Sequence, residues 1–118
     1  MDIICQIKDV YKALYVFEKE FSETFRMTIN EAMLLCCMKD GKSRSANEIT
    51  EFIGLSNPRV SKIITSVEEK GWLNREMGAD DKRKMIFSLS DEGKKIVEMM
   101  KKRQIPLNGI LSKLIENG

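Results

Sequence analysis

The sequence predicts a mainly α fold that carries one small β-hairpin, an α+β architecture. Apolar residues recur every three or four positions through much of the chain, which is the helical period. Ser or Thr followed three residues later by Glu occurs at residues 28–31 and 45–48, a pattern typical of helix starts. Two short segments of alternating polarity flank a charged stretch at 78–84, which is typical of a hairpin. Because 118 residues usually form one domain, we expect a single domain over 1–118.

Composition excludes several classes of protein. With 42% apolar and 32% charged residues, the chain is too apolar to be disordered and too charged for a membrane protein. The longest apolar run is the seven residues 32–38, which is too short to cross a bilayer. The start, Met1-Asp2, lacks a basic and apolar leader, so we expect a cytoplasmic protein without membrane partners.

The absence of histidine argues against most enzymes and metal sites. Histidine is the commonest general base and a frequent zinc ligand, and the three cysteines have no metal-binding spacing. We therefore predict no enzyme activity, no cofactor, no metal and no disulfide framework. The net charge of +2 is small, so binding to nucleic acid would depend on where individual cations lie.

The first half of the chain reads as three helices. The first, over 2–25, carries a stripe that a second element or a second copy of the chain must cover: Ile3, Ile7, Val10, Leu14, Phe17 and Phe21. A helix over 28–38, capped by Thr28 and Glu31, is apolar on nearly all sides and should be central. A short helix capped by Ser45 and closed by Gly54 should turn four residues inward: Ala46, Ile49, Phe52 and Ile53.

The second half begins with a further helix that forms a helix-turn-helix with the short one. Asn57 is the expected N-cap, since Pro58 restricts the residue before it and suits the first helical position. That helix ends at Gly71 and should bury Val60, Ile63, Ile64 and Val67. Next come two strands, at 73–77 and 85–89, then a helix that Ser90 caps and that runs to about Arg103, and a short helix within 107–115. This order is that of a winged helix-turn-helix, with the hairpin as the wing.

The outward face of the 58–70 helix predicts a DNA-reading surface. Pro58, Ser61, Lys62 and Thr65 point away from the apolar side, with Arg59 on the flank, whereas Glu68 and Glu69 would repel phosphates. This asymmetry fits a helix that enters the major groove by its N-terminal half. At the wing tip, Arg83 should probe the minor groove, oriented by Asp81.

The predicted DNA contacts extend to both sides of that helix. Arg44 and Ser45 precede a helix N-terminus and would hold a phosphate there. Alternatively, Ser45 only caps the helix. Arg75 either contacts a phosphate or simply lies on a strand face. The full set of predicted DNA-binding residues is Arg44, Ser45, Ser56, Asn57, Pro58, Arg59, Ser61, Lys62, Thr65, Arg75, Lys82, Arg83 and Lys84.

Residues 55–93 resemble the MarR-type winged-helix transcription regulators, including the small SarA-like members. The resemblance lies in Val60-Ser61-Lys62-Ile63-Ile64, in the stretch 67–75, in Asp81-Lys82-Arg83 and in the stretch 87–93, where Ser90 stands in the place of the usual threonine. It implies a homodimer that binds a pseudo-palindromic operator and is often released by a small effector or by oxidation. It also implies a DNA-binding core over 28–89 and a helical dimerisation region over 1–25 and 90–118.

The chain departs from that family pattern at its end. Only 28 residues follow Ser90, and Pro106 interrupts them. The dimer contact would therefore depend on the first helix and on the apolar residues Leu107, Ile110, Leu111, Leu114 and Ile115.

We interpret the chain as a sequence-specific regulator that binds double-stranded DNA, most simply a repressor. Two alternatives stay open: a winged-helix module that binds another protein, and a regulator that senses oxidants through a cysteine such as Cys5. Cys36 and Cys37 lie in the most apolar helix, where unreactive buried thiols are common. Tyr11 and Tyr15 are left open as the border of an effector cavity, whereas Trp72 is expected in the core.

Overall fold

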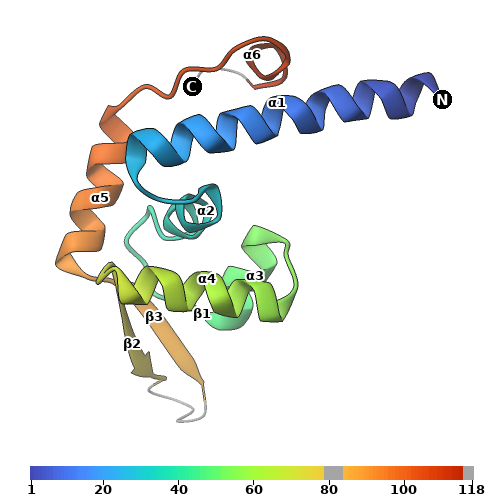
Figure 1. Ribbon diagram of the computed structural model, residues 1–118. Helices are drawn as coiled ribbons and strands as arrows, with labels where there is room; N and C mark the ends of the chain where they lie inside the picture. Colours follow the sequence, from blue (N-terminus) through green and yellow to red (C-terminus); the bar gives the residue numbers. More distant parts are fainter. Residues whose placement is uncertain (79–83, 116–118) are drawn as a thin grey trace. The chain divides into compact units, whose positions relative to one another are not determined.

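The computed structural model describes residues 1–78 and 84–115 (Figure 1). Asp81, Lys82 and Arg83, three of the residues predicted at the wing, lie outside the described residues. The elements are, in order, α1 (Asp2–Phe25), α2 (Ile29–Cys37), β1 (Arg44–Ser45), α3 (Ala46–Ile53), α4 (Asn57–Glu69), β2 (Leu73–Met77), β3 (Met85–Leu89), α5 (Asp91–Lys102) and α6 (Ile110–Leu114).

The chain forms two compact units. The first contains Met1–Ile29 and the chain from Gln104 onward; the second is Asn30–Arg103. Helix α5, which the sequence interpretation grouped with the terminal helices, belongs to the second unit and packs on β3.

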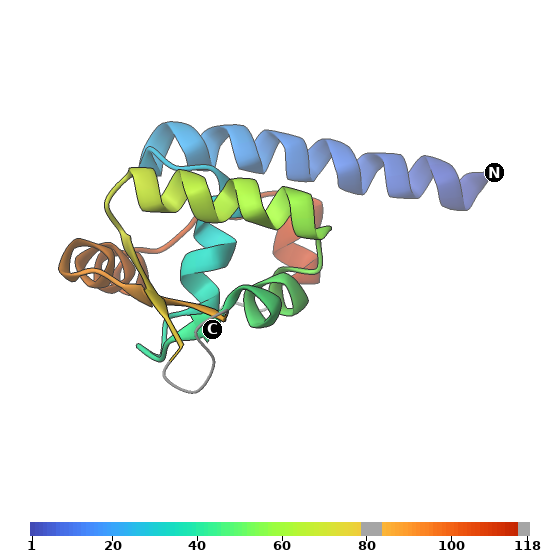
Figure 2. The same ribbon diagram turned by 90° about the horizontal axis from the view of Figure 1, so that it is seen from below.

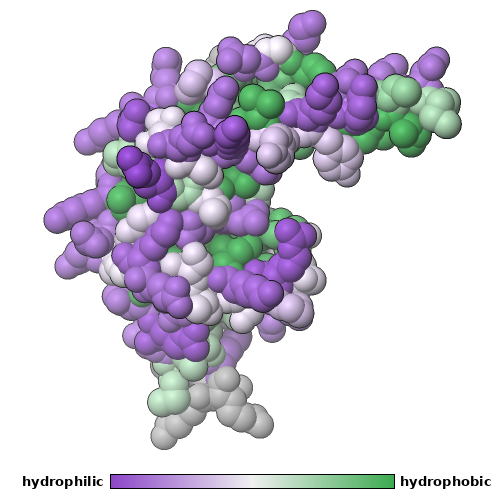
Figure 3. Space-filling view, in the orientation of Figure 1, coloured by the Kyte–Doolittle hydropathy of each residue, from purple (hydrophilic) through white to green (hydrophobic). Residues whose placement is uncertain are grey.

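The first unit pairs α1 with α6. Helix α1 spans the predicted 24 residues and ends at Arg26, whose left-handed backbone (φ 59°) terminates it. The rings of Phe17, Phe21 and Phe25 stack along its C-terminal half, with centroids 5.9 and 4.7 Å apart. Toward the N-terminus the apolar stripe is uncovered: Ile3 is 71% exposed and Ile7 is 45% exposed. Figure 3 shows hydrophobic surface, in green, on the N-terminal part of this helix.

The second unit is a helix-turn-helix on a small sheet. The sheet has the antiparallel order β1-β3-β2 (Figures 1 and 2). In its register Arg75 lies opposite Phe87, and Arg44 lies on the other side of Phe87. Its core is made of fully buried side chains from α2, α3 and α4 and the loop after α2: Leu34, Met38, Ile49, Val60 and Val67. The winged helix-turn-helix predicted from the sequence is therefore the fold that the structure has.

Several local predictions need correction. The N-cap of α4 is Ser56, because its carbonyl accepts the first intrahelical hydrogen bond, from Val60 N–H at 3.0 Å; Asn57 is already helical and Pro58 lies in the first turn. On α3, Ile49 is buried as predicted, but Ala46 and Phe52 are exposed because they lie away from the face that meets the core. The strand β1 was not predicted, since two residues carry no alternation. Helix α6 is shorter than the predicted 107–115.

The capping predictions at two other helices are confirmed. Ser45 and Glu48 form a reciprocal capping box at α3, and the Ser90 hydroxyl accepts the N–H of Gly93 at α5. Among the described residues, no helix combines the length and the apolar character that crossing a membrane requires, α1 included.

Candidate nucleic-acid interface

The N-terminal end of α4 is open toward solvent. Ser56 has an extended backbone (φ −66°, ψ 154°), and its hydroxyl makes no capping hydrogen bond. Ser56, Asn57 and Pro58 are all exposed, and the first turn contains no acidic residue. The free N–H groups and the helix dipole at this end therefore favour an anion such as a phosphate.

The outward face of α4 has the arrangement that its sequence predicts. Val60, Ile63, Ile64 and Val67 are buried, whereas Arg59, Ser61, Lys62 and Thr65 are exposed. Within the described part of the chain, Arg59 and Lys62 make no ion pair. The Thr65 hydroxyl donates to the carbonyl of Ser61 at 3.0 Å, so this side chain presents its methyl group and a hydroxyl that can still accept.

At the C-terminal end of α4, by contrast, charged groups are held within the protein. The carboxylate of Glu31, on α2, is 3% exposed and accepts hydrogen bonds from the hydroxyl of Ser66 (2.5 Å) and the ammonium of Lys70 (2.8 Å). The Lys70 ammonium also lies 4.9 Å from the centre of the Trp72 ring. The spacing of Thr28 and Glu31 predicts a capping box. It cannot predict the contacts of Glu31 with Ser66 and Lys70, which lie 35 and 39 positions further along the chain.

Arg75 on β2 binds Glu68 of α4 through two parallel hydrogen bonds. Its Nε and Nη2 donate to the two carboxylate oxygens at 3.0 and 2.6 Å, and its guanidinium lies 5.3 Å from the centre of the Phe87 ring. The hydrogen bond with Glu68 raises the pKa of Arg75. The side chain of Glu68 is only 23% exposed, so its carboxylate is held by Arg75 rather than simply solvated.

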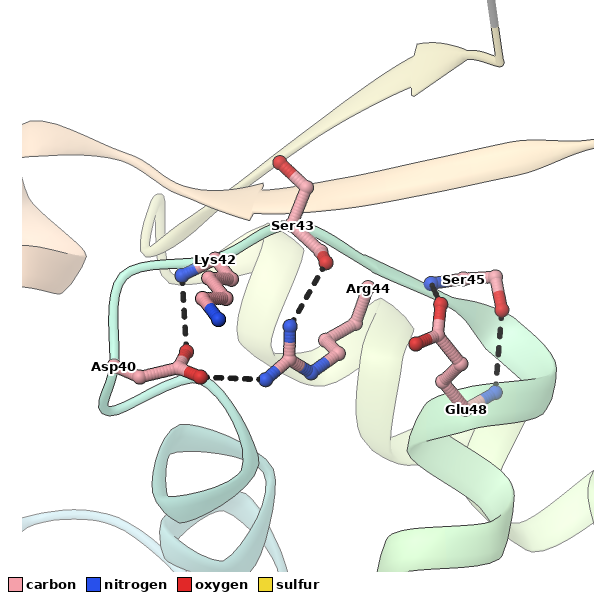
Figure 4. Close-up of polar contacts among 6 residues, drawn as sticks. All are labelled: Asp40, Lys42, Ser43, Arg44, Ser45 and Glu48. Atoms are coloured by element: carbon pink, nitrogen blue, oxygen red, sulfur yellow. Dashed lines mark hydrogen bonds and ion pairs between the residues drawn. The ribbon is translucent and has the colours of Figure 1, made fainter. Parts of the chain in front are cut away.

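Arg44 and Ser45 lie in a polar cluster at the start of α3 (Figure 4). The guanidinium of Arg44 binds the carboxylate of Asp40 at 2.6 Å and the carbonyl of Ser43 at 3.1 Å. The pKa of Asp40 is lowered, first by the backbone N–H of Lys42 and then by Arg44. The Ser45 hydroxyl accepts the N–H of Glu48 at 3.2 Å, so the plain capping role, one of the two predicted alternatives, is present.

Of the three cations predicted at the wing tip, Lys82, Arg83 and Lys84, Lys84 is the one that the structure describes. Its side chain is exposed, and its carbonyl accepts the N–H of Gly78 at 2.7 Å, which joins the two strands near the tip of the hairpin. In Figure 1 β2 and β3 extend as a narrow hairpin away from the helices of their unit.

The three cysteines differ in environment. Cys5 and Cys36 are exposed, which corrects the expectation that Cys36 is buried, and burial raises the pKa of the Cys37 thiol. No group of three or more potential metal ligands occurs among residues 1–78 and 84–115. Oxidant sensing by Cys5 stays a prediction, which replacing Cys5 by serine would test.

A comparison with protein families gives a match over half of the chain. The sequence model of the MarR family matches residues 27–85, from the end of α1 to the first residue of β3. This chain belongs to the MarR family. Two of its curated relatives carry the description HTH-type transcriptional regulator.

Two relatives of this MarR-family chain come from Bacillus subtilis (strain 168). The uncharacterized HTH-type transcriptional regulator YwoH is 25% identical over 97 residues, covering 82% of this chain and 71% of YwoH. The uncharacterized HTH-type transcriptional regulator YhjH is 28% identical over 82 residues, covering 70% of this chain and 47% of YhjH. This chain thus spans about half of the length of YhjH.

Solved structures of the same fold include two complexes with DNA. Overoxidized AbfR bound to DNA matches with a TM-score of 0.74 and 22% identity, covering 86% of this MarR-family chain and 74% of AbfR. A cysteine-to-serine mutant of MarR from E. coli, complexed with operator DNA, matches with a TM-score of 0.74 and 18% identity. The match covers 83% of this chain and 72% of the MarR chain. At these identities the likeness establishes the winged-helix fold.

Proposed function

We propose that this member of the MarR family is a transcriptional regulator that binds double-stranded DNA through α4. The observation that carries the proposal is the asymmetry of that helix. Its N-terminal half presents exposed hydroxyls and the cations Arg59 and Lys62, which make no ion pair within the described residues, whereas Ser66 and Glu68 near its C-terminal end and its C-cap Lys70 are bound within the protein. An N-terminal half of this chemistry suits base edges in the major groove.

Residues around α4 would hold the phosphate backbone. Ser56, Asn57 and Pro58 offer an open helix N-terminus, and Lys84 an exposed cation on the hairpin. We include the wing-tip residues Lys82 and Arg83, with Asp81 orienting Arg83, on the strength of the sequence alone. Arg44, Ser45 and Arg75 already have protein partners, so we assign them to shaping this surface rather than to binding phosphate.

A homodimer on a pseudo-palindromic operator is the assembly that the family resemblance and the first unit support. Helix α1 leaves Ile3, Ile4, Ile7, Tyr11 and Tyr15 exposed, and α6 adds Leu114. Isolated exposed apolar residues are ordinary, but a continuous stripe on one helix favours a protein partner. Two copies joined in this way would present two α4 helices to successive major grooves, and occupancy of a promoter would make the protein a repressor.

Salt dependence tests the proposal against its main rival, a module that binds another protein. If a dimer neutralises ~6 phosphates, the logarithm of affinity should fall with the logarithm of salt concentration with a slope of about −5. The measurement uses fluorescence anisotropy with a duplex that the wild-type protein has selected from a random pool. Failure to enrich any duplex, or an affinity that salt leaves unchanged, would favour the protein-binding module.

A matched pair of lysine variants tests which helix reads the bases. Lys62→Ala should relax discrimination at particular base pairs, by ~1–3 kcal/mol for a good contact. Lys95→Ala, on the exposed face of α5, removes the same charge without touching α4 and should bind like the wild type. Equal base preferences in Lys62→Ala and wild type would reject α4 as the reading helix.

A further inference from the structure

The contact between α2 and the C-terminal end of α4 points to a role beyond stability. Glu31 is a nearly fully buried carboxylate, and it accepts hydrogen bonds from Ser66, in the last turn of α4, and from Lys70, the C-cap of that helix. We propose that Glu31, held by Ser66 and Lys70, is a positioning residue that fixes the recognition helix for sequence-specific DNA reading. The proposal rests on the function proposed above.

Stability alone is a poor reason for burying this charge. Removing the Glu31 carboxylate from water is costly, although the Lys70 side chain stays 33% exposed, and buried ion pairs can often be replaced by apolar side chains of similar volume without loss of stability. What an ion pair with hydrogen bonds adds is direction, since hydrogen bonds tolerate little change in distance or angle, whereas apolar packing is not directional.

The geometry of this contact is suited to fixing a helix. Ser66 lies in the last turn of α4 and Lys70, four residues on, is its C-cap, so the two are neighbours on one side of the end of the helix. Two donors from successive turns on one carboxylate, at 2.5 and 2.8 Å, oppose both rotation of α4 about its axis and sliding along it. One residue of sliding would move each side chain by about 1.5 Å and turn it by about 100°, which is enough to lose a bidentate contact with a base.

The contact is also separate from the residues that we propose to touch DNA. The last proposed DNA-contacting residue on α4 is Thr65. The Lys70 ammonium binds Glu31 and lies over the ring of Trp72, the residue before β2. A change at Glu31 thus alters the placement of Lys62 and Thr65 without removing a group from the DNA-binding surface.

The deciding variant is Glu31→Leu/Lys70→Met, which removes one negative and one positive charge and leaves the net charge unchanged. Its affinities for the selected duplex and for a scrambled duplex of equal length give a specificity ratio, measured together with the salt slope and the melting temperature. We expect the specificity ratio to fall at least tenfold. The affinity for the scrambled duplex should stay within twofold of the wild-type value, and the salt slope should equal that of the wild type within error. A purely structural contact would lower the melting temperature and leave the ratio of the folded variant unchanged.

The control is Glu98→Gln/Lys101→Met, which removes an exposed ion pair on α5 and should change none of these values. A folded Glu31→Leu/Lys70→Met protein whose specificity ratio stays within twofold of the wild type overturns the proposal. Should that variant fail to fold, Glu31→Gln decides: it keeps the shape of the side chain and loses the charge, and an unchanged ratio there also overturns the proposal. If the wild type itself prefers no duplex, the proposed function has failed and not this inference alone.

Discussion

At the scale of single residues, the close approach of Gly93 to the backbone before β2 is the tightest constraint. A Cβ atom on Gly93 would lie 2.2 Å from the carbonyl oxygen of Trp72 and 3.0 Å from its carbonyl carbon. That carbonyl cannot easily move, because it accepts the N–H of Ser90 at 2.9 Å. Only glycine therefore allows α5 to start where it does, directly beside the backbone of Trp72 between α4 and β2.

Gly93→Ala should destabilise the protein, although alanine is the better helix former by ~1 kcal/mol. The clash with fixed backbone should outweigh that gain and cost ~1–3 kcal/mol, as overpacking does in well-packed cores. Thermal unfolding followed by circular dichroism measures the effect. Lys94→Ala, the next residue on the same helix but exposed, should leave the melting temperature nearly unchanged; equal melting temperatures of the two variants would contradict the steric argument.

The capping box at α3 predicts how stability depends on pH. The backbone N–H and the hydroxyl of Ser45 lower the pKa of Glu48 below its ordinary value of 4.5. Since the folded pKa lies below the unfolded one, the contribution of Glu48 is complete above about pH 4.5 and is lost as the pH falls through the folded value. Asp40, whose pKa is lowered in the same way, acts in the same direction.

Glu48→Gln should therefore unfold at a lower urea concentration than the wild type at pH 7. It should also lose less stability than the wild type between pH 5 and acidic pH, because it has no carboxylate left to titrate. Urea unfolding at a series of pH values gives both quantities. Parallel curves for the variant and the wild type would show that Glu48 does not contribute to the acid dependence.

The sequence predicts these residues unequally well, for a physical reason. The caps at Ser45 and Ser90 depend on groups three residues away, so spacing reveals them. The predicted N-cap of α4, Asn57, lies one residue after the observed N-cap, Ser56. Serine and asparagine are both good caps, so only the backbone conformation decides between them. The bond from Glu31 to Lys70 spans 39 residues, and no local pattern encodes it.

At the scale of elements, the hairpin and α4 are joined by the paired hydrogen bonds between Arg75 and Glu68. The sequence predicted both elements from periodicity, yet it left the role of Arg75 open between a strand face and a phosphate contact. Its two bonds to Glu68 and its position over Phe87 favour bracing of the hairpin. The outward face of α4 was predictable because its apolar side had already been assigned to the core.

Arg75→Ala should consequently leave the salt slope of DNA binding unchanged. The pair is partly exposed, so its loss should cost less than ~1 kcal/mol of stability. Lys84→Ala, which removes an exposed hairpin cation from each chain of the dimer, should instead reduce the magnitude of the slope by about two. A reduced slope in Arg75→Ala would show that Arg75 does reach a phosphate.

At the scale of the whole molecule, function requires more than the second unit can supply by itself. The family match over residues 27–85 lies almost entirely within that unit, which contains the proposed reading helix and the hairpin strands. The first unit contains no proposed DNA contact but leaves a long apolar stripe on α1 exposed. The periodicity of residues 2–25 predicted that stripe, yet a single sequence cannot show what covers it, since the partner is not part of the same chain.

Ile3→Glu/Ile7→Glu tests whether a second copy covers the stripe. Both side chains are exposed in the single chain, so the change should leave folding intact; in a dimer it would bury two unpaired charges per chain, which is costly. Sedimentation should therefore show a monomer where the wild type sediments as a dimer. Affinity for a duplex with two half-sites should fall toward that for a duplex with one, because the gain from linking two reading helices is lost. The control, Gln6→Glu, adds a charge beside the stripe on the same helix and should remain dimeric. If Ile3→Glu/Ile7→Glu also sediments as a dimer, the stripe binds a partner other than a second copy of the chain.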